Sequence, residues 1–194
     1  MKTIIKKAFF DLGPGILHSE AWRKDLWEGY EIIGLEPDPT RYNILKDSYP
    51  GILLNLAVSN EIGQIKGIFH STSGFIVYGY PGYSETVTIS AVTLDWLDKE
   101  YGPFDEIAIW ADIEGSELNM LKGATEVLKK TNWINVELHT GPKTEHWARS
   151  YDVYAFLEKL GFVTLTKEKP QTLHDSCYDA TFTRDINIKK YEKN

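Results

Sequence analysis

The stretch Phe9-Phe10-Asp11-Leu12-Gly13-Pro14-Gly15 decides the fold, because it joins the end of an apolar strand to a glycine-containing turn. We expect a buried strand over residues 8–12 and a helix over residues 16–28. Glycines directly after a strand let a ligand approach the backbone, and the following helix offers free N–H groups. The pattern predicts a ligand site at the carboxyl end of this strand, where open α/β sheets bind ligands.

The rest of the chain alternates short apolar runs with amphipathic stretches, which favours repeated βαβ units. Strands are expected at residues 8–12, 31–36, 52–58, 106–112, 133–139, 162–166 and 179–184. Helices are expected at residues 16–28, after Pro37-Asp38-Pro39, at residues 93–100, from Gly115-Ser116 to Lys129-Lys130, and from Trp147 towards Gly161. The final strands leave no room for a crossover helix. The sequence predicts a doubly wound α/β fold: a mostly parallel seven-stranded sheet with an antiparallel last strand.

The bulk composition predicts a single domain over residues 1–194, long enough to bury a core without disulfides or metals. No apolar run is long enough to cross a bilayer, and the net charge of −7 disfavours nucleic acid as a partner. The single cysteine, Cys177, is expected to be a small buried hydrophobe. With no secretion signal at the N-terminus, the expected location is the cytoplasm.

Residues 63–91 are rich in Gly, Ser and Tyr and predict a hairpin-bearing insertion rather than a crossover helix. The aromatic residues of this insertion include Phe69, Phe75, Tyr78, Tyr80 and Tyr83. Aromatic faces with polar rims suit sugar rings, which present C–H patches as well as hydroxyls. The same residues would equally suit a hairpin packed on the sheet, so both interpretations stay open.

Two acids stand at the ends of the first two predicted strands. Asp11 would repel a diphosphate but would attract a cationic amino-acid tail such as that of S-adenosylmethionine. Glu36 follows Gly15 by 21 residues, where nucleotide-binding α/β folds place an acid that accepts both ribose hydroxyls. The alternatives are a plain tight turn at Gly13-Pro14-Gly15 and a helix-start acid at Glu36, although Asp38 already fills the capping position.

The strand over residues 133–139 carries a polar face. Asn135, Glu137 and His139 share one side by period two, whereas the residues between them are apolar. Burying an unpaired carboxylate costs several kcal/mol, so Glu137 must be neutral, hydrogen-bonded, paired or coordinating. We interpret this face, together with the preceding strand end at Asp112 and Glu114, as a functional site, with a structural buried network as the alternative.

Seven short segments, taken in order, resemble the FkbM-type family of class I S-adenosylmethionine-dependent methyltransferases. The resemblance covers about residues 8–140, and its strongest part is the Asp-Ile-Glu-Gly-Ser-Glu run followed by Leu-Lys-Gly-Ala. The segments are Phe10-Asp11-Leu12-Gly13, Ile33-Gly34-Leu35-Glu36-Pro37-Asp38, Leu56-Ala57-Val58-Ser59 with Gly63, Val92-Thr93-Leu94-Asp95, Asp112-Ile113-Glu114-Gly115-Ser116-Glu117, Leu121-Lys122-Gly123-Ala124 and Val136-Glu137-Leu138-His139.

The resemblance implies the class I methyltransferase sheet and S-adenosylmethionine as cofactor. It implies that the methionine end of the cofactor lies near Asp11 and Gly13, its ribose on Glu36, and its adenine by Ala57 and Val58. The full set of cofactor-binding candidates is Asp11, Gly13, Gly15, Glu36, Pro37, Ala57, Val58 and Asp112. The implied reaction is O-methylation of a sugar, glycan or other hydroxylated acceptor.

Methyl transfer to a hydroxyl needs aligned reactants and a base that removes the proton. Asp112 and His139 are the candidate bases, and Glu114 and Glu137 are candidates for orienting them. Asp112, Glu114 and His139 could instead hold a divalent ion that lowers the pKa of the hydroxyl, but we favour a metal-free base because this ligand set is sparse.

Three other functions are alternatives. A non-catalytic cofactor-binding module is supported by Leu17 and Trp110, which depart from the family pattern. A methyltransferase of a small hydroxylated natural product keeps the same chemistry with another acceptor. A nicotinamide-dependent oxidoreductase is disfavoured because the first loop lacks Gly-x-Gly-x-x-Gly.

Overall fold

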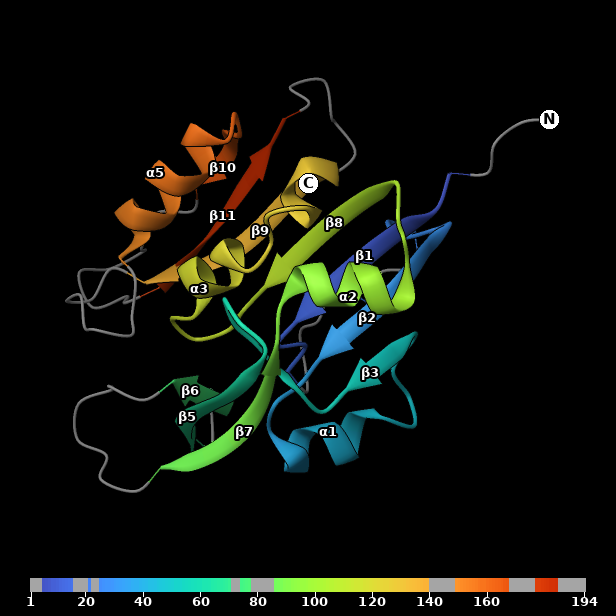
Figure 1. The fold of residues 1–194 in the computed structure, drawn as a ribbon, viewed down its shortest axis with the longest axis vertical. Helices are drawn as coiled ribbons and strands as arrows, with labels where there is room; N and C mark the ends of the chain where they lie inside the picture. The colour runs from blue at the N-terminus through green and yellow to red at the C-terminus, as the bar shows by residue number, and fades with distance from the viewer. Residues whose placement is uncertain are drawn as a thin grey trace.

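The computed structural model describes residues 5–15, 21, 25–70, 74–77, 86–139, 149–167 and 177–184. Its large sheet has the strand order β10-β11-β9-β8-β1-β2-β3 (Figure 1). These strands are β1 (Lys7–Leu12), β2 (Tyr30–Leu35), β3 (Ile52–Leu54), β8 (Glu106–Ala111), β9 (Thr131–His139), β10 (Val163–Lys167) and β11 (Cys177–Thr183). The strands from β9 to β3 pair in parallel, whereas β11 is antiparallel to both β9 and β10. The predicted mostly parallel sheet with an antiparallel last strand is confirmed.

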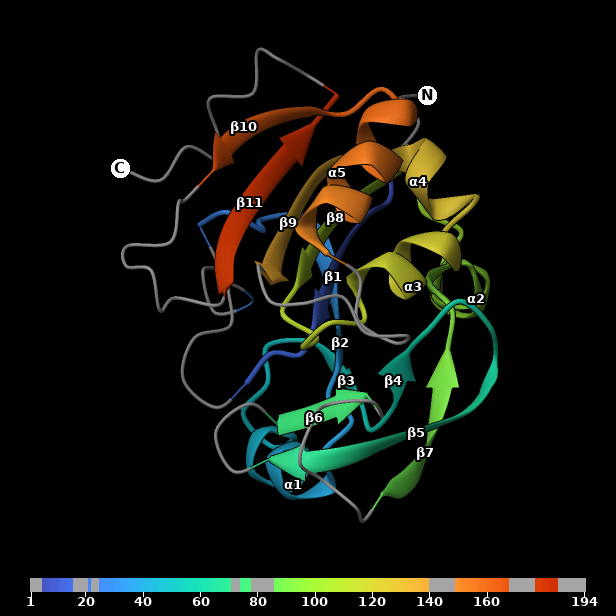
Figure 2. The same ribbon diagram turned by 90° about the vertical axis from the view of Figure 1, so that its left-hand side faces the viewer.

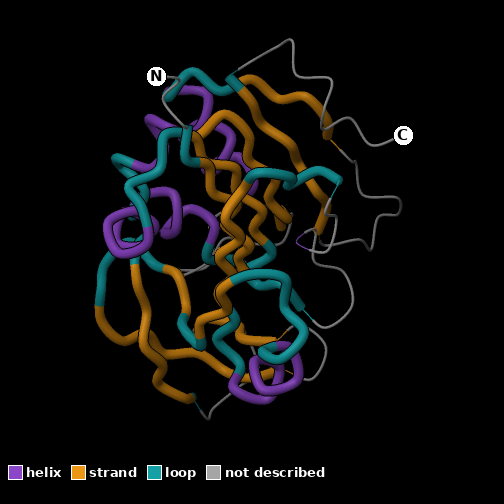
Figure 3. Tube along the Cα trace, turned by 90° about the vertical axis from the view of Figure 1, so that its right-hand side faces the viewer, coloured by secondary structure: helices purple, strands orange, loops and turns teal. Residues whose placement is uncertain are grey.

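One face of the large sheet is covered by the helices α2 (Leu94–Tyr101), α3 (Glu117–Lys122), α4 (Val127–Lys130) and α5 (Ser150–Lys159), which are labelled in Figure 2 and drawn in purple from the opposite side in Figure 3. Their buried apolar residues pack with Phe10 of β1, Ile109 of β8 and Val136 of β9 in one core cluster. Burying such side chains stabilises the fold by about 1.5–3 kcal/mol each. Among the described residues, no helix is long and apolar enough to cross a membrane.

The opposite face of the sheet carries an aromatic cluster. The rings of Phe9 and Trp27 stack with their centroids 3.8 Å apart, and Trp27 also meets Trp133 at 5.6 Å. Ala21 and Tyr49 are buried in the same cluster. Most of the helix predicted at residues 16–28 lies outside the described residues, so that prediction stays open.

The predicted strand at residues 52–58 is wrong as a single strand, because the chain changes sheets within it. β3 joins the large sheet, whereas β4 (Ala57–Val58) pairs with β7 (Val87–Val92) in a second sheet of order β4-β7-β5-β6. Between the two strands, the side-chain amide of Asn55 donates to the carbonyls of Glu36 and Pro37, at 2.8 and 3.1 Å. These bonds hold the chain at the end of β2 and redirect it away from the large sheet.

The small sheet contains most of the residues predicted to form a hairpin-bearing insertion. β5 (Gly63–His70) pairs in antiparallel fashion with β6 (Gly74–Val77) and with β7. The small sheet lies on the side to which the parallel strands of the large sheet point their carboxyl ends (Figure 2). The insertion is therefore on the side where we predicted the ligand site.

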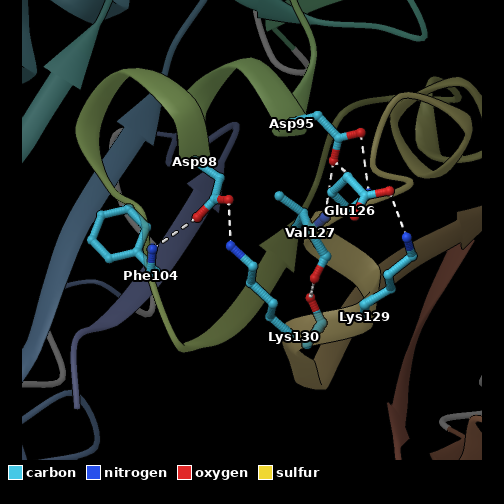
Figure 4. Close-up of polar contacts among 8 residues, drawn as sticks. Asp95, Asp98, Phe104, Glu126, Val127, Lys129 and Lys130 are labelled. Atoms are coloured by element: carbon cyan, nitrogen blue, oxygen red, sulfur yellow. Dashed lines mark hydrogen bonds and ion pairs between the residues drawn. The ribbon is translucent and has the colours of Figure 1, made fainter. Parts of the chain in front are cut away.

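The helix predicted to run continuously from Gly115-Ser116 to Lys129-Lys130 is wrong, because it breaks into α3 and α4 at Gly123. A side chain at Gly123 would place its Cβ 2.3 Å from the carbonyl oxygen of Ser59, so the close approach requires glycine. The carboxylate of Asp95 accepts hydrogen bonds from the backbone N–H groups of Glu126 and Val127, both at 2.9 Å (Figure 4). This capping starts a new helix at Val127.

Asp98 ties α4 to the helix that precedes β8. It forms an ion pair with Lys130 at 2.6 Å and accepts a hydrogen bond from the backbone N–H of Phe104 at 2.9 Å (Figure 4). Thr93 caps the other end of α2 by accepting from the N–H of Trp96 at 3.1 Å. The Thr-Leu-Asp segment at residues 93–95 thus fixes two helix starts on the covered face of the sheet.

Candidate active site

Polar side chains form rows across the carboxyl edge of the large sheet, on the face that carries the aromatic cluster. Glu137 of β9 lies opposite Asp179 of β11, and His139 lies opposite Cys177. Asp112 directly follows β8, the other neighbour of β9. The period-two interpretation of β9 is confirmed in structural terms, because Ile134, Val136 and Leu138 pack into the core on the other face.

Asp112 and Glu137 share a hydrogen bond between their carboxyl groups. Asp112 is exposed on one side, yet protein surrounds its carboxyl closely enough for desolvation, followed by the charge of Glu137, to raise its pKa to about 7. Desolvation also raises the pKa of Glu137, and the charge of Glu114 adds to the increase. At neutral pH the pair therefore takes up and releases a proton readily.

Glu114 and His139 complete this group, which we call the acid–histidine cluster: Asp112, Glu114, Glu137 and His139. The Nε2 atom of His139 lies 3.6 Å from Oε2 of Glu137 and 3.9 Å from Oε2 of Glu114. Burial lowers the pKa of His139 to about 4, so the imidazole is neutral at physiological pH. Glu114 has a φ of 50°, a left-handed conformation uncommon for a residue with a side chain.

Two residues of β11 at this edge were missed by the sequence analysis. Cys177 is half-buried rather than a buried hydrophobe, and its thiol shares a hydrogen bond with Glu137. Desolvation, with the charge of Glu137, raises the pKa of this thiol to about 12, which keeps it protonated. Asp179 raises the pKa values of both Asp112 and Glu137 by its charge. Only the antiparallel pairing of β11 with β9 brings these residues to the cluster, and the last strand was predicted to begin two residues later.

Glu117 is a further acid that sequence reasoning left without a role. It is completely enclosed at the start of α3, where its Oε1 accepts a hydrogen bond from the N–H of Gly115 at 3.0 Å. Desolvation raises its pKa to about 8, although this backbone hydrogen bond acts in the opposite direction. Glu117 shapes the turn that carries Glu114, which explains an acid at the end of the Asp-Ile-Glu-Gly-Ser-Glu run.

The second acidic region, which we call the β2 site, is Glu36 with the backbone of Asp38 and Gly15. Glu36 is 2% exposed, and its Oε1 accepts a hydrogen bond from the N–H of Asp38 at 2.9 Å. A backbone hydrogen bond from Gly15 also favours the carboxylate, but desolvation is the larger effect and raises the pKa of Glu36 to about 7. Pro37 lies half-buried between Glu36 and the capping residue Asp38.

Gly13 lies where the two regions meet. Its N–H donates to the carbonyl of Leu35 at 3.0 Å, and a Cβ at this position would lie 2.0 Å from the carbonyl oxygen of Asp112. Its φ of 75° favours glycine as well. Only a residue without a side chain lets the chain turn here between the ends of β2 and β8.

Asp11 is fully buried beneath this turn rather than open at the sheet edge. Its Oδ2 accepts a hydrogen bond from the hydroxyl of Tyr49 at 2.7 Å, and burial beside this carboxylate raises the pKa of Tyr49. Ala57 and Val58 are also buried, and Val58 belongs to the main core. Contacts of these three residues with a cofactor stay predictions.

Comparison with known proteins gives a family match. Residues 17–164 match the family model described as the methyltransferase FkbM domain. None of the curated proteins is detectably similar in sequence.

The chain is also similar to several solved structures. One is magnesium protoporphyrin IX methyltransferase from Synechocystis PCC 6803 with bound SAM, which has 9% sequence identity and a TM-score of 0.47. The match covers 94% of this chain and 72% of that chain. A human methyltransferase 10 domain containing protein has 11% identity and a TM-score of 0.45, covering 95% and 74%. The N-terminal domain of EvdMO1 in the presence of SAH and D-fucose has 12% identity and a TM-score of 0.45, covering 91% and 74%.

Proposed function

Because the chain belongs to the methyltransferase FkbM domain family, we propose that it is an O-methyltransferase that transfers the methyl group of S-adenosylmethionine to a hydroxyl of a sugar-like acceptor. One observation carries the proposal: the carboxyl edge of a single sheet holds a buried acid suited to ribose beside an acid–histidine cluster suited to proton removal. In this proposal the buried acid, Glu36, binds the cofactor, and the acid–histidine cluster removes the proton from the acceptor hydroxyl.

The residues at the β2 site fit the cofactor. Glu36 is held by backbone N–H groups of two separate loops, so its carboxylate is fixed in place. A fixed carboxylate can accept hydrogen bonds from two neighbouring ribose hydroxyls without losing side-chain entropy on binding. The absence of a side chain at Gly13 lets the turn after β1 pack against the backbone of Asp112, so the β2 site and the acid–histidine cluster lie next to each other, as a cofactor spanning both regions requires.

The acid–histidine cluster provides the base. S-adenosylmethionine supplies the methyl group from its sulfonium, and the acceptor oxygen takes it in line as S-adenosylhomocysteine leaves and the hydroxyl proton passes to a base. Asp112 is the base in our proposal, because it is the acid of the cluster that is exposed to solvent. Asp112 accepts the proton when both carboxyls of the pair are ionised, and this proton then forms the hydrogen bond from Asp112 to Glu137. His139, neutral and buried, orients the cluster.

The small sheet supports a sugar-like acceptor. Phe69 of β5 is 38% exposed, and this sheet lies on the side of the carboxyl ends (Figure 2). An exposed aromatic ring suits the C–H face of a sugar. Of the other aromatic residues considered, Tyr78, Tyr80 and Tyr83 lie outside the described residues, and the side chain of Phe75 is not described.

The test is a methyl-transfer assay with glycosides, free sugars and hydroxylated aromatic compounds as acceptors. We expect S-adenosylhomocysteine to form with a sugar acceptor and the product to gain one methyl group on oxygen. Phe69→Ala should raise KM for that acceptor with little change in kcat. Ile62→Ala, which also removes an exposed apolar side chain, serves as its matched control.

Each contrary outcome selects another function. Turnover confined to aromatic acceptors would favour a natural-product methyltransferase. Binding of S-adenosylmethionine without turnover on any acceptor would favour the non-catalytic module, which the departures from the family pattern at Leu17 and Trp110 support. Binding of NAD in its place would favour the oxidoreductase.

A further inference from the structure

Three residues of the acid–histidine cluster bring possible metal-ligand atoms close together. One side-chain donor atom from each of Glu114, Glu137 and His139 lies within 4.8 Å of the other two. Two atoms bound to the same ion at about 2.1 Å lie roughly 3.0–3.5 Å apart. The separations of 3.6 and 3.9 Å from His139 Nε2 to the two carboxylates are therefore a few tenths of an ångström from coordination distance.

We propose that Glu114, Glu137 and His139 bind one divalent cation, of the Mn²⁺ class, at the carboxyl ends of β8 and β9. The ligand set differs from the sequence-based candidates, because Glu137 takes the place of Asp112. Binding itself needs no methyl transfer. The role of the ion rests on the proposed function: beside Asp112, it would contact the acceptor hydroxyl and make its proton easier to remove.

The surroundings of the three residues favour a cation. Asp112 and Asp179 add two more carboxyl groups close enough for their charges to act on Glu137 or on one another. Their mutual repulsion raises the free energy of the ionised cluster, and a bound cation would remove that repulsion. His139 is only 8% exposed, so its imidazole is held by the surrounding protein in the orientation that faces both carboxylates.

The donor types select the class of ion. Mg²⁺ and Ca²⁺ prefer sites made wholly of oxygen, and structural zinc sites favour four closed ligands rich in sulfur and nitrogen. The two carboxylates suit Mn²⁺, and the neutral imidazole is a ligand typical of first-row transition ions, so the mixed set favours Mn²⁺ over Mg²⁺ and Ca²⁺. Three protein ligands leave coordination positions open for water or an acceptor hydroxyl. The position of His139 on a central strand supplies the nitrogen that distinguishes this set from a plain acidic surface.

Titration of the purified protein with MnCl₂, followed by the electron paramagnetic resonance signal of free Mn²⁺, tests the proposal. We expect one ion per chain and an increase in Kd of at least about tenfold in Glu137→Gln and in His139→Gln. Glu100→Gln removes one negative charge from an exposed position on α2 and is the matched control. It should bind Mn²⁺ as the wild type does.

A second readout avoids variants that fail to fold. Pulsed resonance spectra of the wild type with Mn²⁺ should show coupling to an imidazole nitrogen, which a purely acidic surface site would not give. Absence of Mn²⁺ binding to the folded wild type, or binding without nitrogen coupling, would overturn the proposal. Calorimetry with S-adenosylmethionine in metal-free buffer separates the two hypotheses, because failure there counts against the proposed function and not against the cation site.

Discussion

The β2 site and the acid–histidine cluster lie at the same sheet edge, but their carboxyl groups have different hydrogen-bond partners. In the β2 site, one buried carboxyl is held by backbone N–H groups of Asp38 and Gly15. In the cluster, Asp112 and Glu137 share a hydrogen bond with each other, and desolvation raises both pKa values, with a further increase from the charges of neighbouring acids. Backbone donors fix a carboxylate for binding, whereas crowded acids exchange protons.

The positive charge of Arg41 on α1 (Pro39–Leu45) acts on both regions.

The largest effect should be a loss of turnover when the proposed base in the acid–histidine cluster is removed. Asp112→Asn removes the proton acceptor but keeps the size of the side chain, so kcat should fall by about 10²–10⁴-fold. The affinity for S-adenosylmethionine should change by less than about threefold. Steady-state kinetics with calorimetry checks both numbers, and a variant with wild-type kcat would remove Asp112 from the reaction.

Gly13 tests whether the two regions depend on their close contact. Gly13→Ala should lower the free energy of unfolding by about 2–4 kcal/mol, since its Cβ would meet the carbonyl of Asp112 and φ is positive. Gly15→Ala is the matched control, because its φ is 55° but no atom lies within 4 Å of the added Cβ. It should cost about 1 kcal/mol. Urea denaturation compares them, and equal losses would show that the contact with Asp112 is unimportant.

Changing the β2 site should have a smaller effect, confined to the affinity for S-adenosylmethionine. Glu36→Gln should raise the Kd for S-adenosylmethionine by about 10–100-fold, because a neutral amide accepts hydrogen bonds less strongly than a carboxylate. Wild-type affinity should increase as pH rises through about 7, where Glu36 ionises, and the variant should lack this dependence. Glu31→Gln, at an exposed residue of β2, the strand that Glu36 directly follows, is the control. An unchanged Kd in Glu36→Gln would exclude Glu36 from the ribose contact.

The smallest effect should be a change in the pH dependence of stability at Glu117, whose carboxyl accepts a hydrogen bond from Gly115 in the turn that carries Glu114. Its pKa of about 8 in the folded chain is raised from 4.5, so its contribution to stability is complete below pH 4.5 and is lost as pH rises through 8. Glu117→Gln can keep the hydrogen bond from Gly115 and has no charge to bury. At pH 8.5 the variant should be more stable than the wild type, with no advantage at pH 4.5. A constant difference across this range would contradict the raised pKa.

The sheet was predictable from the sequence because its signals are local. The apolar strand before Gly13 and the alternation around Glu137 depend on neighbouring residues, and the structure has both strands. The helix break at Gly123 depends on Asp95, which is 31 residues before Glu126. The end of β3 likewise depends on Asn55 reaching the carbonyl of Glu36, 19 residues away. Hydrogen bonds between distant segments leave no periodic pattern in the sequence.

The candidate site divides in the same way. Asp112, Glu114, Glu137 and His139 were found because they occupy strand ends or a polar strand face. Cys177 and Asp179 were missed because their place depends on the pairing of β11 with β9. Asp11 shows the reverse case, since its position after an apolar strand predicted a ligand contact, whereas Tyr49 and burial give it a structural partner.

The most direct test is the affinity of S-adenosylmethionine for the wild type, Glu36→Gln and Asp112→Asn, measured by calorimetry under identical conditions. If Glu36 binds the cofactor and Asp112 acts only in the reaction, the wild type should bind with a Kd in the micromolar range. Asp112→Asn should bind nearly as well, and Glu36→Gln should bind at least about tenfold more weakly. Folded wild-type protein that binds no S-adenosylmethionine would contradict the proposed function. Equal losses in the two variants would contradict the division.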